Sequence, residues 1–370
     1  MKKIKTYLKK AIRNTPLWAR ISLCLGLFSG IMYLSFLISP EFSDFFNRYP
    51  AAFLRALLAK ITGVLPFSVA ETVIMLLPII ITLVVIKIIK AARSELKESF
   101  KMFVSMMAVL SLFFTSFSLM FASGYRGTTL DKKLGLERTA VSATDLDATA
   151  RVLLNELKEL VPQVTFAPSG SSVMPYSLFT MDDRLQDAYI KASEKYDFLP
   201  SFRSTVKPII LSEPMTYTHI SGIYTFFTGE SNINTNFPDY TLPYTAAHEL
   251  AHQRGIARED EANFVAFLVC IDSDDVYIRY SGYMNLFEYV LGALYSADSK
   301  AYNAIVNEMG NTLIGEIVAY NEFFDKYRDN VVADVSGSMN DNYLQSQGQT
   351  AGSRSYGMVV DLAVAYYKVK

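Results

Sequence analysis

The sequence contains little histidine, little cysteine and almost no net charge. Its 370 residues include three histidines and two cysteines, and the formal net charge is −1 at pH 7. A charge near zero argues against a general nucleic-acid-binding protein, because such domains carry a basic excess. Cys24 lies in an apolar run and Cys270 in a predicted helix near the motif described below, so we expect no disulfide between them. Repeats and nucleotide-binding glycine motifs are lacking too.

Apolar residues, in contrast, are abundant and are concentrated in the first third of the chain. Hydrophobic residues make up 51% of the sequence, and three apolar runs occupy 18–38, 72–89 and 103–122. Each is long enough to cross the hydrocarbon core of a bilayer, and Pro78 is expected to kink the second. The first run could also be a cleaved signal peptide, but it is long for one and no small-x-small cleavage site follows it. We therefore predict a membrane domain over 1–123, with a lipid bilayer as partner.

Basic residues predict the orientation of these helices. They gather in the tail before Pro16 and in the connection between the second and third runs, at Lys87, Lys90, Arg93, Lys97 and Lys101. The positive-inside rule places both segments, and so the N-terminus, in the cytoplasm. The domain over 124–370 would then be extracytoplasmic. Glu41–Ser68 has an amphipathic pattern and could lie on the membrane surface or pack on the soluble domain.

The chemistry of the sequence is concentrated in the segment 245–263. It contains His248-Glu249-Leu-Ala-His252, with two of the three histidines. On a helix, this HExxH spacing places two imidazoles on one face, where they can bind a single Zn²⁺ beside a carboxylate. Apolar neighbours indicate a packed helix, and Gly255 is expected to end it and turn the chain. A second helix then follows, from about Arg258 to Ile271, with acidic residues in its first turn.

A third zinc ligand is expected in the first turn of that second helix. Glu259 shares a helical stripe with small residues, which lets its face approach the helix of the histidines closely. Glu261 instead shares its stripe with large apolar residues that have the pattern of a core. We therefore predict His248, His252 and Glu259 as metal ligands, with Glu261 as the alternative third ligand. Asn263, one turn after Glu259, could hydrogen-bond a ligand.

The second helix resembles a motif of known metallopeptidases. Glu259-Asp-Glu-Ala-Asn263-Phe-Val-Ala-Phe-Leu resembles the ExxAN-x-FA helix that follows HExxH in ImmA/IrrE-type metallopeptidases and, more loosely, the ExxxD helix of other gluzincins. In those families the first glutamate is the third zinc ligand, which implies this role for Glu259 and a supporting role for Asn263. The two motifs lie much closer together here, so a tight glycine turn must join them.

The whole chain also resembles an uncharacterised bacterial family of membrane proteins. That family is a domain-of-unknown-function family with N-terminal membrane helices and an extracytoplasmic HExxH domain. The stretches that carry the resemblance are 227–234, the segment from HELAHQRG to EAN, 279–283 and 340–344. The resemblance implies a multi-pass protein of the bacterial cell membrane, but it names no substrate.

The soluble part is predicted to be α+β, as a mainly helical zincin-like metallopeptidase domain with a small sheet. Helical patterns cover 148–160, 181–196, 279–295, 301–327 and 356–367, and 208–227 is rich in strand-forming residues. Within 222–234 we expect an edge strand that lies above the zinc helix and pairs with an extended peptide, as in zincins generally. The polar stretch 335–355 is predicted to be a loop that rims the cleft.

Three further residues could stabilise the oxyanion of a tetrahedral intermediate. They are Tyr280, Tyr283 and His219. Packing alone explains the two tyrosines equally well in a chain with 23 tyrosines. His219 lies in the predicted strand region, where a histidine more often makes a structural hydrogen bond.

Taken together, these features predict a membrane-anchored zinc metallopeptidase. Three protein ligands leave one zinc position open for a water of lowered pKa. Glu249 would take a proton from that water and pass it to the leaving amine. The alternative is a non-catalytic membrane-anchored sensor or binding protein on a zincin scaffold, against which the intact Glu249 argues. An intramembrane protease is not expected, because the motif lies far beyond the last apolar run. Whether the substrate is a peptide, an envelope protein or a cell-wall cross-link is left open, as is the oligomeric state.

Overall fold

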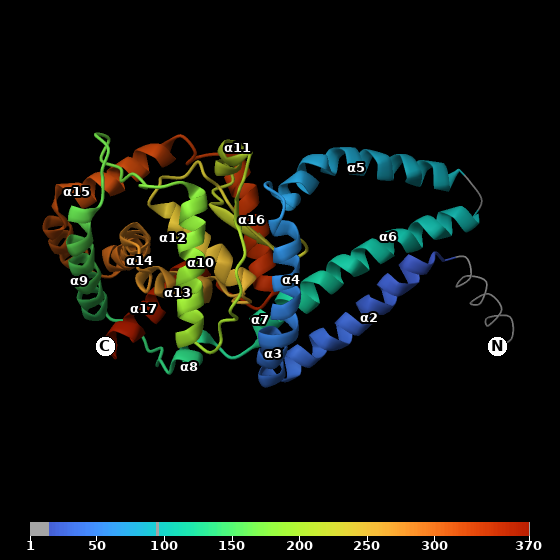
Figure 1. The fold of residues 1–370 in the computed structure, drawn as a ribbon, viewed down its shortest axis with the longest axis horizontal. Coiled ribbons are helices and arrows are strands. Elements are labelled where there is room, and N and C mark those ends of the chain that lie inside the picture. The colour runs from blue at the N-terminus through green and yellow to red at the C-terminus, as the bar shows by residue number, and fades with distance from the viewer. Residues whose placement is uncertain (1–14, 94–95, 370) are drawn as a thin grey trace.

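The computed structural model describes residues 15–93 and 96–369, and it is mainly helical with one small sheet. Figure 1 shows a helical body and three long helices that extend away from one side of it, with a layer of short helices between them. The mainly helical α+β class predicted from the sequence is confirmed.

Three helices are long and apolar enough to cross a membrane. They are α2 (Leu17–Ile38), α5 (Val69–Ala92) and α6 (Leu96–Phe117), with the third span running from Lys97 to Met120. Most of their large apolar side chains are exposed, as helices surrounded by lipid require. The start of α2 and the adjoining ends of α5 and α6 lie at the end away from the body (Figure 1). The third helix begins before the predicted Phe103, because the charged residues that precede the apolar run do not break a helix.

Small residues hold α2 against α6. Ser111 Oγ donates to the Ser22 carbonyl at 2.7 Å, and Ser118 Oγ donates to the Ser29 carbonyl at 3.0 Å. Gly26 lies between these two bonds, and a Cβ added there would overlap Ser111 Oγ. Close backbone approach with serine hydrogen bonds is a usual way for apolar helices to associate in lipid.

The segment between α2 and α5 packs on the body. It forms α3 (Pro40–Phe46), the π-helical turn η1 (Asn47–Ala51) and α4 (Ala52–Gly63). Arg55 in α4 is fully buried and donates to the carbonyls of Met120 and Arg254. Asn47 Nδ2 donates to the Gly255 carbonyl at 2.9 Å. Of the two alternatives for this segment, packing on the body is the one observed.

The sheet has three short strands in the order β1-β3-β2. β1 (Val206–Pro208) pairs in parallel with β3 (Glu230–Ile233), and β2 (Gly222–Thr225) pairs with β3 in antiparallel orientation. The predicted edge strand is therefore β2, whereas β3 is central and buried. The prediction of strands throughout 208–227 is wrong in part, because Ser212–Thr216 forms the short helix α11, where Pro214 is well placed in a first turn.

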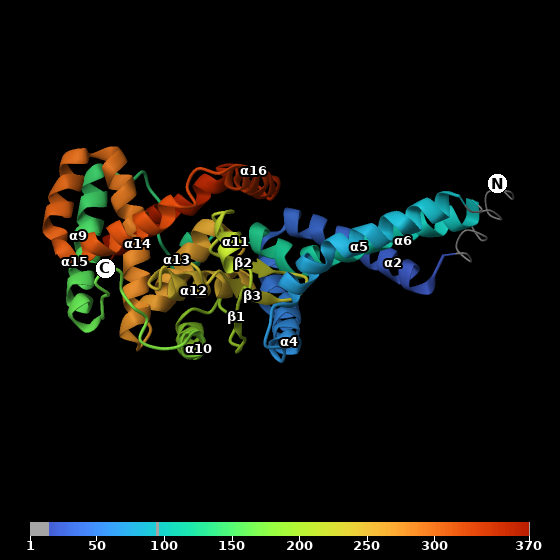
Figure 2. The same cartoon turned by 90° about the horizontal axis from the view of Figure 1, so that it is seen from above.

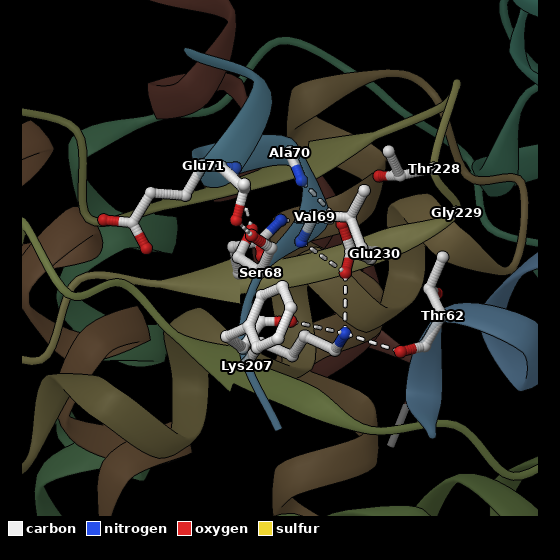
Figure 3. A network of polar contacts seen from close by, with 12 residues as sticks. Thr62, Ser68, Val69, Ala70, Glu71, Lys207, Thr228, Gly229 and Glu230 are labelled. Carbon is white, nitrogen blue, oxygen red and sulfur yellow. Dashed lines mark hydrogen bonds and ion pairs between the residues drawn. The ribbon is translucent and has the colours of Figure 1, made fainter. Parts of the chain in front are cut away.

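The first turn of α5 is attached to the sheet by a buried ion pair (Figure 3). Glu230 of β3 accepts hydrogen bonds from the amides of Val69 and Ala70 at 3.0 and 2.9 Å. Lys207 of β1 lies 2.6 Å from Glu230 and donates to the Thr62 carbonyl. A carboxylate is stabilised at a helix N-terminus by the free amides and the helix dipole. The start of α5 is therefore held in a fixed position relative to the sheet.

The core of the body lies among longer helices. These are α9 (Ala143–Leu160), α10 (Leu178–Lys195), α12 (Thr241–Gln253), α13 (Glu259–Ile271), α14 (Val276–Ala297), α15 (Ser299–Asp325) and α17 (Val359–Lys368). Figure 2 shows α12 and α13 between α10 and α14, and both are buried along almost their whole length. The predicted helices are confirmed with shifted ends. α9, for example, starts at Ala143 because Ser142 and Asp145 form a capping box.

Shorter helical segments complete the chain. They are η2 (Ser118–Ala122), α7 (Ser123–Arg126), α8 (Leu130–Leu134), η3 (Val161–Gln163), α16 (Val331–Ser346) and η4 (Gly352–Met358). The predicted loop over 335–355 is therefore wrong for most of its length. Asn330 caps α16 by accepting from the Ala333 amide at 2.9 Å, and Leu344 is buried. Capping and packing thus stabilise a helix whose glycine, serine and asparagine content gives it low propensity. α17 is buried over most of its length.

Candidate metal centre

The helix α12 places both histidines of the HExxH motif on one buried face. It ends at Gln253, and Gly255 then turns the chain with a φ of 94° while its amide donates to the His252 carbonyl at 2.9 Å. A Cβ at residue 255 would overlap Asn47 Oδ1 and lie 2.5 Å from Arg55 Nη2. Glycine is therefore needed here both for its backbone conformation and for close approach. The glycine turn predicted between the two helices is confirmed.

This turn brings the first residue of α13 back to the histidines. Glu259 Oε2 lies 3.2 Å from His248 Nε2 and 3.3 Å from His252 Nε2. One ligand atom from each residue lies within 4.8 Å of the others, and all three residues are buried, so the group could hold a metal ion. Glu261 is engaged elsewhere, since its Oε1 accepts from the Leu130 amide at 3.0 Å. The geometry favours Glu259 over Glu261 as the third ligand.

The donor atoms of this group fit a bound cation. Glu259 Oε2 is buried and has no hydrogen-bond partner among the described residues, an arrangement that is costly for a charged oxygen unless a cation compensates it. His252 Nδ1 lies 2.7 Å from the Ile256 carbonyl oxygen. This nitrogen therefore carries the proton, which leaves Nε2 as the donor to a metal. Two imidazoles and a carboxylate suit several divalent transition metals, zinc among them.

The three side chains are strongly coupled electrostatically. Burial raises the pKa of Glu259, but the imidazoles of His252 and His248 lower it well below its usual range. Burial lowers the pKa of His252, but Glu259 raises it to about 9. Without a cation, the carboxylate thus favours a proton on the imidazole, and a metal that binds here must displace that proton.

Glu249 lies between the metal group and β2. It is buried, and its carboxylate accepts a hydrogen bond from the Tyr224 backbone amide. A Cβ at Gly222 would lie 2.6 Å from Glu249 Oε1, so the strand passes close to this carboxylate only because residue 222 is glycine. Burial raises the pKa of Glu249, although the two histidines lower it. A raised carboxyl pKa favours proton exchange near neutral pH.

Two adjoining cavities meet at His248 and Glu249. One, of about 440 Å³, extends toward Glu288 and α15. The other, of about 600 Å³, is lined by all three residues of the metal group and extends toward Phe121, Phe226 and α16. Together they form a cleft that passes the metal group on both sides. Its α16 wall is the part of 335–355 that was predicted to rim the cleft.

The three predicted oxyanion stabilisers occupy different places. His219 lines both cavities, but its Nε2 lies 2.6 Å from the Tyr327 carbonyl oxygen and is engaged there. Tyr280 is fully buried, and its hydroxyl donates to Glu316 at 2.8 Å. Tyr283 packs against the core and does not line the cleft. The structure therefore does not bring either tyrosine to the metal group, because both face the packed side of α14.

Asn263 lines the cleft, but its amide bonds to residues other than the ligands. Its Nδ2 donates to the Tyr356 carbonyl at 3.2 Å, and its side chain also bonds to Tyr289. Tyr356 and Tyr289 line both cavities, and the Tyr356 ring stacks on His248 with 6.4 Å between ring centres. The sequence did not single out these tyrosines. The stretch 340–344, which carries part of the family resemblance, pointed to Tyr356 indirectly, because Asn340 bonds to the Tyr356 hydroxyl.

The fold and the site place the chain in a class of mainly helical α+β proteins. This class combines three helices that are apolar enough to span a membrane with a buried group of two histidines and a glutamate. Within this class, the chain belongs to the family described as protein of unknown function (DUF3810), whose family model matches residues 46–364. The predicted membership of an uncharacterised family is thereby confirmed. No curated protein and no solved structure matches the chain, so the resemblance to gluzincin peptidases gains no support from these comparisons.

Proposed function

We propose that the chain is a membrane-anchored, zinc-dependent metallopeptidase that hydrolyses peptide bonds. The observation that carries the proposal is the convergence of His248, His252 and Glu259, with Glu249 beside them in a cleft. The position of β2 at a sheet edge supports it, because an extended peptide can pair with an open strand edge. The resemblance of α12 and α13 to the zincin-like helices of gluzincins, HExxH followed by Glu, supports the same class.

The chain's own residues divide the chemistry among them. His248, His252 and Glu259 would hold zinc, which when bound supplies a Lewis acid that lowers the pKa of water. Glu249 accepts the proton of the attacking water and delivers it to the leaving amine. Asn263 holds the Tyr356 backbone at the cleft wall through its 3.2 Å hydrogen bond. The cavities on both sides of Glu249 accommodate the peptide before and after the bond that is cut.

We further propose that the body is extracytoplasmic in a bacterial cell membrane and that the N-terminus is cytoplasmic. Lys87, Lys90 and Arg93 near the end of α5 away from the body support this orientation through the positive-inside rule. The test places single cysteines at the exposed positions Ser338 and Arg93 in a chain whose native cysteines are replaced by alanine. A membrane-impermeant maleimide on intact cells should label position 338 and not 93, and the reverse pattern would reject the orientation.

The metal site is tested by the zinc content of the full-length protein in detergent. We expect stoichiometric zinc in the parent, and loss of zinc in Glu259→Gln. Glu261→Gln is the matched control, because it makes the same change two residues further along the same helix, where the side chain bonds to Leu130. Glu249→Gln should also keep its zinc. A parent without zinc, or a Glu259→Gln variant that retains it, would refute the ligand set.

Hydrolysis is tested on a degenerate peptide library by mass spectrometry. The parent should cleave peptides, and Glu249→Gln should retain zinc while losing about a hundredfold or more in rate, as removal of a general base predicts. A parent that holds zinc but cleaves no peptide would favour the alternative function, a sensor or binding protein on this scaffold.

A further inference from the structure

The metal group lies next to the end of a helix that could span a membrane. The third span ends at Met120, within η2. Phe121, the next residue, is buried and packs edge-on against the His252 ring, with 5.7 Å between ring centres. It also lines the cavity that contains the metal group. A ligand of the candidate metal site is thus in contact with the first residue after the span.

The strand β2 runs from the metal group toward the same span. Its first residue, Gly222, passes against Glu249. The turn that follows its last residue contacts α6, since Phe226 packs on Phe117 at 5.4 Å and Phe227 packs on Phe113 at 5.1 Å between ring centres. Both partners on α6 lie within the span. The far end of β2 therefore lies beside the third candidate span.

Along this path β2 is an edge strand, and of its outward-facing groups the Tyr224 amide donates to Glu249. The Asn234 amide donates to the Ser221 carbonyl at 2.8 Å. Because bonded and non-bonded pairs alternate in an antiparallel ladder, Gly222 and Tyr224 direct their main-chain groups away from β3. Within the described part of the chain, no further strand pairs with that edge. An extended peptide can therefore add to it as a fourth strand.

Two sets of buried polar contacts hold the spans and the sheet in a fixed arrangement. On one side, Arg55 joins η2, at the end of the third span, to the turn after α12 through the carbonyls of Met120 and Arg254. On the other side, Glu230 and Lys207 join the start of α5 to β3 and β1 (Figure 3). Removing one partner of such a buried charge pair is strongly destabilising. The cleft therefore has a fixed distance and a fixed orientation relative to the ends of the spans.

The rim of the cleft near the spans is apolar. Val331, Val335 and Met339 of α16 are 75%, 54% and 69% exposed, and they line a groove of about 630 Å³ beside the cleft. α16 contacts α6 through Tyr343 and Phe117, whose ring centres are 6.5 Å apart. Exposed apolar side chains at this position suit surroundings that contain lipid.

We propose that the substrate is the segment of a polypeptide next to its own apolar membrane anchor, bound in extended form along the outer edge of β2. The inference rests on the proposed peptidase function, because it names the substrate class of that site. The anchored end lies beside Phe226, and the segment reaches Glu249 after about four residues at roughly 3.3 Å per residue. The bond that is cut then lies about four to eight residues from the anchor.

Binding is tested by photo-crosslinking with the full-length protein in phosphatidylethanolamine–phosphatidylglycerol vesicles. The probe is one degenerate decapeptide library, either acetylated or palmitoylated at one of its ends. A photo-reactive residue replaces Ile223, which is 39% exposed on β2, or Val64, which is 79% exposed in the turn before α5 and serves as the control near the spans. Both are placed in Glu249→Gln, so that the peptide is not consumed.

We expect the palmitoylated library to crosslink to position 223 about tenfold more than to position 64, because anchoring raises the effective concentration at the cleft. The acetylated library should show no such excess. Equal crosslinking at the two positions, or capture of the acetylated library at 223 as efficient as that of the palmitoylated one, would overturn the inference.

Hydrolysis by the parent separates this inference from the proposed function. Cleavage of the palmitoylated library about four to eight residues from the anchor supports both. Cleavage of the acetylated library at the same rate keeps the peptidase and overturns the inference. Anchored peptide held at position 223 but left uncut by the parent supports the binding mode and contradicts the peptidase.

Discussion

Single glycine residues decide how closely the groups of this site approach one another. Gly222 lies against Glu249 and Thr245, and Gly255 lies against Asn47 and Arg55. A side chain at the first position would move the proposed base. A side chain at the second would move the turn that carries Glu259 back to the histidines.

We expect Gly222→Ala to lower peptide hydrolysis about tenfold or more without changing the zinc content. The added methyl would lie 2.6 Å from Glu249 Oε1 and 2.9 Å from Thr245 Cγ2, so the carboxylate has to move while the ligands stay. A displacement of about 1 Å can cost roughly a hundredfold in rate. Gly292→Ala is the control, since nothing lies within 4 Å of its added Cβ. Similar losses in the two variants, or zinc lost from Gly222→Ala, would disprove this explanation.

Glu288 is expected to make stability depend on pH. Burial raises its carboxyl pKa to about 7, although the Tyr240 hydroxyl, 2.8 Å away, donates to it and lowers the pKa. The pKa in the unfolded chain is about 4.3. Between these values the folded state binds more protons than the unfolded state, so the free energy of unfolding falls as pH rises. Glu288→Gln should therefore be more stable than the parent at about pH 8 but not at about pH 4, as thermal unfolding in detergent can measure. An equal difference at both pH values would show that the carboxyl does not titrate in this window.

Residue-level prediction succeeded where a helix alone determines which side chains share a face. The helical stripe of small residues indicated Glu259, and the structure brings this residue to His248 and His252. The same approach could not exclude Tyr280, because the hydroxyl of that residue bonds to Glu316 from a different helix. It also missed Tyr356, which is distant in sequence and reaches His248 only through tertiary packing.

At the scale of elements, a buried ion pair joins the candidate membrane helix α5 to the sheet. The Lys207–Glu230 pair is almost completely buried, with side-chain exposures of 3% and 1%. The pair therefore contributes to the attachment of α5 only while both partners are present.

We expect Lys207→Met to destabilise the protein by about 3–5 kcal/mol, because it leaves Glu230 charged and buried. The double variant with Glu230→Gln should be less destabilised than the sum of the single variants, since the amide still accepts from the α5 amides. Lys326→Met is the exposed control, with a partner in Glu213, and should change the stability little, because solvent screens an exposed ion pair. Denaturant unfolding in detergent measures all four, and strict additivity would contradict the coupling.

The elements themselves were predictable where pattern length was decisive. Runs of about twenty apolar residues predict helices that can span a bilayer, and α2, α5 and α6 have that length and composition. α16 was missed because its stability comes from the Asn330 cap and from burial of Leu344, which composition does not show. The strands β1 and β3 were not delimited correctly because each has only three or four residues, too few for an alternating pattern.

At the scale of the whole molecule, the composition changes from apolar to mixed near residue 123, but the packed structure has no boundary there. Buried contacts cross it from Arg55 to Arg254, from Asn47 to Gly255, and from Phe121 to His252. The sequence suggested a soluble domain from 124 onward, because local composition carries no information on such long-range contacts. The helices of the first third thus form part of the wall of the candidate site.

We therefore expect the fragment 124–370 to bind zinc more weakly than the full chain and to unfold at lower temperature. Without residues 1–123, Glu230 loses its partners on α5, Lys207 loses the Thr62 carbonyl, and His252 loses Phe121. The fragment 40–370 is the matched control, because it lacks α2 but keeps Arg55, α5 and α6, and it should retain zinc like the full chain. Chelator competition measures the affinity, and thermal unfolding measures the stability. If 124–370 matched the full chain in both zinc affinity and stability, the helices of the first third would act only as a tether. The proposed binding of a membrane-anchored segment along β2, next to Phe121, would then lose its structural basis.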